Sequence, residues 1–144
     1  MKWLILMHVL GATVWVGGHL ILSIGVLPKA LRENNPQIIL DFEKHFEKIG
    51  LPSLLLQVVT GISMALIYVP FRFWGSLSTP HHVYLWTKLA LLTGTLLLAI
   101  HARFFILPRL TEQKLPLLAF HIVLVTVLAL FFVLTGLSFR FYYF

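Results

Sequence analysis

Cysteine is absent from this sequence, and only five of its 144 residues are acidic. Without a thiol, the chain cannot form a disulfide, a zinc–thiolate centre or a redox-active dithiol. Charged residues of both signs make up 11% of the chain, whereas soluble domains contain about 25%. These absences exclude a disulfide-stabilised secreted domain and argue against a soluble globular protein.

Apolar residues dominate the chain instead, at 59% of the sequence. A helix needs about 20 apolar residues to cross a hydrocarbon layer of ~30 Å. Four runs reach this length, and they cover residues 3–28, 49–71, 83–107 and 115–139. The first run is too long for the apolar core of a signal peptide. We therefore predict an all-α integral membrane protein, a single transmembrane domain over residues 1–144 with a bundle of four transmembrane helices.

The only clearly polar segment, residues 29–48, lies between the first two runs. Phe42, Phe46 and Ile49 are spaced to share one helix face, and charged residues surround them. An apolar stripe on a charged helix is typical of helices that lie in the membrane interface. We therefore expect a short interfacial amphipathic helix between the first and second membrane helices.

Lysine and arginine are distributed unequally between the two ends of this predicted bundle. One end holds seven of them, and these are Lys29, Arg32, Lys44, Lys48, Arg103, Arg109 and Lys114. The opposite end holds three, namely Lys2, Arg72 and Arg140. Basic residues accumulate on the cytoplasmic side of a membrane. We therefore expect a multi-pass protein of a prokaryotic inner membrane with both termini on the periplasmic side. The net charge of +6 then reflects membrane orientation, and no nucleic-acid partner is expected.

Four histidines, His8, His19, His101 and His121, lie within the apolar runs. An ionisable side chain in hydrocarbon is a candidate functional residue. At about 1.5 Å per residue, three of them share a depth in the cytoplasmic half, and His8 lies in the other half. The alternative for any single histidine is an interhelical hydrogen bond, worth about 1 kcal/mol. We expect His45, His81 and His82 to lie outside the hydrocarbon.

Each run also presents one face of polar or small residues, as a bundle that holds a cofactor needs. In the first run this face comprises His8, Ala12, Trp15 and His19, with Gly17 and Gly18 beside it to allow close approach. The faces expected for the other runs are Gln57, Gly61, Met64 and Tyr68; Thr87, Ala90, Gly94 and His101; and His121, Val125, Leu128 and Phe132. Lys88 lies about 140° around the helix from His101, so it can extend to the outer interface.

Two segments resemble the copper-resistance D (CopD-type) membrane proteins. They are H8-VLGATV-W15-V-G17-G18 followed by P28-K29, and L85-W-T-K88 continuing to L107-P108-R109-L110. The spacing of His, Trp and Gly, together with Lys88, is also similar to the HemJ-type protoporphyrinogen oxidases, a related group. The resemblance implies functional roles for His8, Trp15 and Lys88. It also implies copper transport or resistance, or porphyrinogen oxidation, as the activity.

The ligand types distinguish copper from haem. Copper(I) favours thiolate and thioether ligands, and the only sulfur atoms within the runs are those of Met7 and Met64. Zinc or copper(II) would need carboxylates to balance the charge, and no Asp or Glu lies in any run. Imidazoles on facing helices suit haem iron. The leading hypothesis is therefore a protein with one or two b-type haems, which transfers electrons to a redox partner or quinone, or acts as an oxidoreductase.

The expected inner axial ligands are His101 with His121 or His19, and His8 could hold an outer haem with Met64 or Lys88. Gln57 can contact the cofactor or bond a neighbouring helix. Copper transport, a HemJ-like oxidase and a structural subunit remain as alternatives, and a homodimer stays open.

Overall fold

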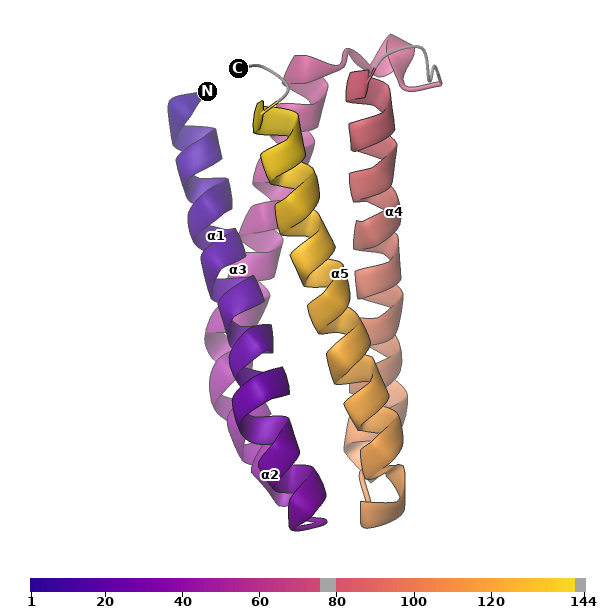
Figure 1. Cartoon of the computed structure of the whole chain (residues 1–144). Coiled ribbons are helices and arrows are strands. Elements are labelled where there is room, and N and C mark those ends of the chain that lie inside the picture. Colours follow the sequence, from indigo (N-terminus) through magenta and orange to yellow (C-terminus); the bar gives the residue numbers. More distant parts are fainter. Residues whose placement is uncertain (76–79, 142–144) are drawn as a thin grey trace.

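The computed structural model describes residues 1–75 and 80–141, and the side chains up to residue 138. The described chain is a bundle of four long antiparallel helices (Figure 1). α1 begins and α5 ends at the same end of the bundle (Figure 1). The helical segments in order are α1 (Lys2–Leu20), η1 (Ile21–Val26), α2 (Leu27–Arg32), α3 (Gln37–Tyr68), η2 (Phe71–Phe73), α4 (Pro80–His101), η3 (Ala102–Ile106), η4 (Leu107–Arg109), η5 (Glu112–Lys114) and α5 (Leu115–Phe141).

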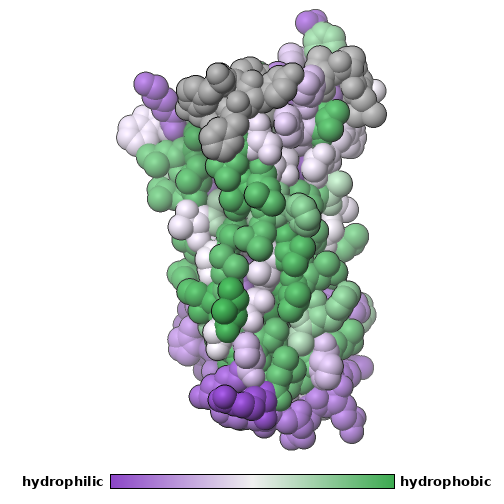
Figure 2. Space-filling model, in the orientation of Figure 1, coloured by the Kyte–Doolittle hydropathy of each residue, from purple (hydrophilic) through white to green (hydrophobic). Residues whose placement is uncertain are grey.

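The four rods are long and apolar enough to cross a membrane, and they cover Lys2–Arg32, Gln37–Tyr68, Pro80–Arg109 and Glu112–Ser138. Large apolar side chains face outward along them, as a lipid environment requires. Figure 2 shows hydrophobic residues over most of the visible face, with hydrophilic residues gathered at the end that holds α2. The predicted all-α bundle with four membrane helices is confirmed.

The structure differs from the prediction at the polar segment, which does not form a separate interfacial helix. α3 begins at Gln37 and runs without a break for 32 residues, so most of the polar segment forms its first turns. Ile49 is 60% exposed and does not share the inward face of Phe42 and Phe46. α3 is continuous because a stripe of inward-facing residues, spaced alternately by four and three positions, runs across the polar segment and packs along its whole length. This stripe comprises Ile39, Glu43, Phe46, Gly50, Ser53, Gln57 and Thr60.

The helices pair as two hairpins. α1 packs along α3, α4 packs along α5, and α1 also meets α5. Within the described residues, direct contacts between α3 and α4 are few. The main buried core lies near the end that holds α2, and its members are Leu22, Leu27, Ala30, Ile39, Ile106, Leu115, Leu118 and Ile122. This core anchors the two hairpins to each other.

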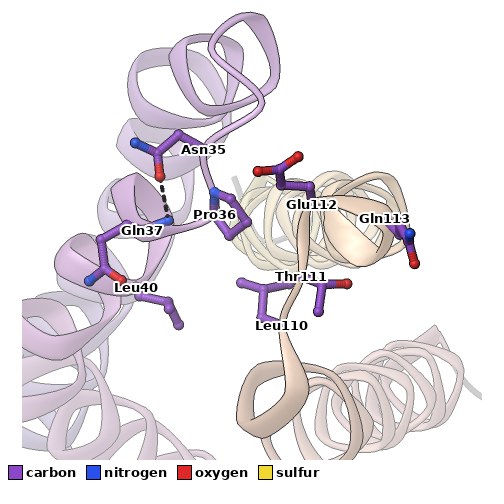
Figure 3. A pocket seen from close by; sticks show the side chains of 8 residues that line it. All are labelled: Asn35, Pro36, Gln37, Leu40, Leu110, Thr111, Glu112 and Gln113. Atoms are coloured by element: carbon purple, nitrogen blue, oxygen red, sulfur yellow. Dashed lines mark hydrogen bonds between the residues drawn. The ribbon is translucent and has the colours of Figure 1, made fainter.

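The two connections at this end of the bundle are also joined. Asn34, in the left-handed region with φ 48°, donates a hydrogen bond from Nδ2 to Glu112 Oε2 at 2.9 Å. Figure 3 shows the hollow between the connections, where the Asn35 Oδ1 accepts a bond from the Gln37 amide at 3.0 Å. The hollow measures about 540 Å³, and its lining contains no histidine. It is therefore separate from His19, His101 and His121.

Candidate histidine site

His101 and His121, which the sequence placed at one depth, are in direct contact. His101 Nδ1 lies 2.9 Å from His121 Nε2, and the rings stack with centroids 4.9 Å apart. His121 donates from Nδ1 to the Leu117 carbonyl at 2.9 Å, since a carbonyl can only accept. In the neutral ring the Nε2 of His121 then carries a lone pair, and this lone pair accepts the N–H of His101. His121 is buried, whereas His101 is exposed at the end of α4.

His19 has the same hydrogen-bonding pattern as His121. Its Nδ1 donates to the Trp15 carbonyl at 2.9 Å, so its Nε2 also presents a lone pair in the neutral ring. A backbone acceptor on one ring nitrogen is the usual way in which proteins orient a metal-binding histidine. Thr126 donates its proton mainly to the Ile122 carbonyl at 2.7 Å, and its Oγ1 lies 3.3 Å from the His19 carbonyl, so α5 meets α1 beside the site. In both histidines Nε2 is therefore the nitrogen with the lone pair, and in His121 this lone pair accepts the His101 N–H.

His19 and His121 line one cavity of about 160 Å³, which we call the histidine pocket. Its other ionisable lining residues are Glu43, Glu47 and Arg103. Its apolar lining comprises Trp15, Leu22, Phe46, Leu51, Leu98, Ala99, Ala102, Leu107, Leu118, Ile122 and Val125, with Gly50 beside Phe46. The pocket therefore combines imidazole and carboxylate donors inside an otherwise apolar bundle.

The two carboxylates were missed by the sequence argument, which assigned them to the interface. Glu47 pairs with Arg103 through two contacts, Oε1 to Nη2 at 2.7 Å and Oε2 to Nη1 at 2.9 Å. The available signal was the spacing of Glu43, four residues after the buried Ile39 and seven before the buried Gly50. The objection that a divalent ion would find no carboxylate in the bundle is therefore wrong.

Phe46 fills the space that the small residues of α1 were expected to leave for a ligand. A Cβ added at Gly18 would collide with the Phe46 ring, and one added at Gly50 would lie 2.7 Å from Phe46 Cε1. The ring also lies edge-on to His19, with centroids 5.9 Å apart. Trp15 is buried against His19, with ring centroids 4.3 Å apart. α3 therefore does approach α1 closely at Gly18, but the side chain of Phe46 fills the space there.

His8 lies in the other half of the bundle, apart from this pocket. Its Nδ1 bonds Thr60 Oγ1 at 2.9 Å, and Thr60 donates its own proton to the Leu56 carbonyl at 2.6 Å. Thr60 is therefore the acceptor of a His8 N–H. A Cβ at Gly61 would lie 3.2 Å from His8 Cε1, which shows how closely α1 and α3 approach here.

Three other residues expected at the site lie in this half or between the halves. Gln57 donates from Nε2 to the Gly11 carbonyl at 3.2 Å and so joins α3 to α1. Met64 is half-buried on α3. Lys88 is half-buried too, and its Nζ comes within 4.0 Å of a Cβ built on Gly136. Lys88 therefore reaches toward α5 within the bundle.

The face expected for α4 is partly wrong. Thr87 and Ala90 are exposed, whereas Thr95 is 1% exposed and faces the core. Thr95 and His101 are roughly 120° apart around the helix, so a stripe drawn through His101 misses the buried side. Gly94 does face α5, because a Cβ there would lie 3.6 Å from Leu128 Cδ1.

His82 and His45 differ in burial. His82 is 8% exposed, because α4 begins at Pro80 and its first turn packs inward. His45 is exposed, and its Nδ1 bonds the Asp41 carbonyl at 2.7 Å.

The pocket has the donors for a metal ion but not a closed coordination shell. Among the residues that the structure describes, no three His, Asp or Glu side chains are placed to share one metal ion. As the two rings stand, the His101–His121 pair leaves no room for a haem iron between its nitrogens. Two axial imidazole nitrogens would stand roughly 4 Å apart with metal–nitrogen bonds of about 2 Å, and here they are 2.9 Å apart.

A family model described as Copper resistance protein D matches residues 40–139, which is more than half of the chain. The match includes Glu43, Glu47, Arg103, His101 and His121, and it begins after the whole of α1 and α2. No curated protein and no solved structure matches the chain.

Proposed function

Since this chain belongs to the copper resistance protein D family, we propose that it moves copper ions across its membrane through the histidine pocket. The observation that carries the proposal is the pairing of His19 and His121 with Glu43 and Glu47 around one cavity. Imidazole nitrogens are good copper ligands, and carboxylates balance a divalent charge that hydrocarbon would otherwise exclude. The pocket supplies both within an apolar bundle.

The donor set favours copper(II) over copper(I) as the cargo. Nitrogen and oxygen ligands select copper(II), whereas copper(I) prefers sulfur, and the pocket lining contains no methionine. A translocated ion must also be held weakly enough to leave again. Two imidazoles with exchangeable carboxylates meet this condition better than a closed four-ligand site does.

In this proposal, His101 is the hydrogen-bond partner of His121 Nε2 when no copper ion is bound. Copper can bind His121 Nε2 only after the His101 N–H that occupies its lone pair has moved away. Because His101 is exposed at the end of α4, its ring has room to turn outward. The His101–His121 bond would then close when the ion leaves and keep the buried nitrogen satisfied.

The outer half of the bundle suits a cation less well. Lys88 reaches into the bundle there, and a lysine ammonium repels a second cation at close range. His8 also lies apart from the cavity that His19 and His121 line together with two carboxylates. We therefore assign the main resting site to the inner histidines rather than to His8.

The haem hypothesis, with electron transfer to a redox partner or quinone, finds no support in these contacts. The pocket of about 160 Å³ is smaller than the roughly 300–1,000 Å³ of typical small-molecule sites. Purified protein should accordingly lack a Soret absorption band when the cells have adequate haem.

Transport by purified protein in lipid vesicles tests the proposal. We expect vesicles with the wild-type protein to accumulate copper(II) faster than protein-free vesicles. Replacing both His19 and His121 with alanine should bring uptake close to the protein-free rate, because no oriented imidazole remains in the pocket. Equal uptake with and without the wild-type protein would contradict the proposal, and a haem spectrum would return support to the earlier hypothesis.

We also propose the orientation that the basic residues indicate, with both termini on the periplasmic side of a prokaryotic inner membrane. A reporter enzyme that works only outside the cytoplasm should be active when it is fused to the C-terminus. The same reporter inserted between Asn34 and Asn35 should be inactive. The reverse pattern would show that the histidine pocket lies nearer the periplasm.

A further inference from the structure

The Glu47–Arg103 ion pair lies at the rim of the histidine pocket. Both residues line the pocket, and their side chains remain 31% and 54% exposed, respectively. The pair is bidentate, with contacts at 2.7 and 2.9 Å. A bidentate arginine–carboxylate pair fixes the geometry of both groups more firmly than a single contact does. The rim is therefore held by two contacts between α3 and η3.

This rim spans the side of the bundle where helix packing is weakest. α1 packs on α3, α4 on α5, and α1 on α5, but described contacts between α3 and α4 are few. Glu47 belongs to α3, and Arg103 follows α4 in η3. The ion pair therefore bridges two elements that pack little against each other.

The Arg103 guanidinium places a positive charge next to the proposed copper site. An arginine stays protonated under all ordinary conditions, so it can release Glu47 only by moving. It lies in a π-helical turn that starts directly after His101, and such turns are frequent at functional sites. Glu43, one turn before Glu47 on α3, lines the same cavity and remains to balance an ion.

We propose that Glu47 and Arg103 form a gate between α3 and α4, and that a copper ion displaces Arg103 from Glu47 as it passes. The displacement rests on the proposed transport function. The closure of the pocket by the ion pair does not, so the two can be tested separately.

The absence of cysteine allows a direct test of closure without copper. A single cysteine at Ala99, which lines the pocket, reports access through its rate of reaction with N-ethylmaleimide. We expect Arg103→Gln to speed this reaction roughly two- to fivefold, the range set by a partly exposed ion pair. Arg103→Lys should have a smaller effect, because it keeps the charge and loses the bidentate contact.

Two controls separate the gate from general loosening of the fold. A cysteine at the exposed Lys29, in α2, should react at a rate that Arg103→Gln leaves unchanged. Arg32→Gln, which removes the exposed contact to Glu33 at 4.0 Å, should leave the Ala99 cysteine unaffected. Exchanging the charges, with Glu47→Arg and Arg103→Glu together, should restore slow labelling.

Copper uptake by the same variants completes the test. If the gate is correct, Arg103→Gln speeds both labelling and copper uptake. Unchanged labelling, or fast labelling that the charge exchange fails to slow, would overturn the gate whatever the cargo is. Faster labelling with no copper uptake by any variant, wild type included, would retain the closure and overturn the transport function and the displacement step.

Discussion

Replacing His121 with alanine is expected to lower the copper(II) affinity of the purified protein at least tenfold. His121 is the more deeply buried member of the contacting pair, and its backbone bond to Leu117 orients Nε2 as a ligand. Loss of groups that merely orient a ligand costs about 10–100-fold in metal affinity, so loss of the ligand itself should cost no less. Competition with a chelator of known affinity measures this change.

His45→Ala is the matched control for this variant. His45 makes the same type of backbone hydrogen bond, to Asp41, but it is exposed and does not line the pocket. Its removal should leave copper affinity within the error of the measurement. Equal affinities for the wild-type protein and the His121→Ala variant would show that copper binds elsewhere.

Gly18→Ala is expected to destabilise the bundle by about 1–3 kcal/mol, the usual cost of overpacking a filled interior. The new Cβ would collide with Phe46, whose ring is also confined on its other side by Gly50. Because Phe46 lines the histidine pocket, the repacking should weaken copper binding as well. Thermal unfolding in detergent, followed by circular dichroism, measures the loss of stability.

Gly17→Ala provides a neighbouring control, because nothing lies within 4 Å of a Cβ at that position. It should unfold at nearly the wild-type temperature. Adding Phe46→Leu to Gly18→Ala should recover part of the loss, since a smaller side chain leaves room for the methyl group. If both glycine variants unfold at one temperature, close packing between α1 and α3 at Phe46 is not a determinant of stability.

The membrane spans and the histidine layer could be predicted from the sequence because both depend on simple geometry. Length and apolarity alone decide whether a helix can cross a bilayer, and a fixed rise per residue gives the depth of each histidine. That arithmetic placed His101 and His121 at one level, where the structure finds them in contact. The CopD resemblance is confirmed independently, by the family match over residues 40–139.

The chemistry of the pocket could not be predicted because it depends on packing. The charged residues around Glu43 and Glu47 indicated an interface, but tertiary contacts draw one face of that segment into the bundle. The rotation of α4 was set from His101, which contacts His121 but is largely exposed, so the buried Thr95 was missed. Because Glu43 and Glu47 line the pocket, a divalent ion there does not lack carboxylates to balance its charge.

Electron paramagnetic resonance of the purified protein loaded with one equivalent of copper(II) tests the central claim most directly. Imidazole ligands should split the copper signal through their nitrogen nuclei, and the pocket predicts coupling to two nitrogens. His19→Ala and His121→Ala should each reduce this to one, while His8→Ala and His45→Ala leave it unchanged. A spectrum of free aqueous copper, or nitrogen coupling that survives the double His19→Ala and His121→Ala replacement, would contradict a copper site in the histidine pocket.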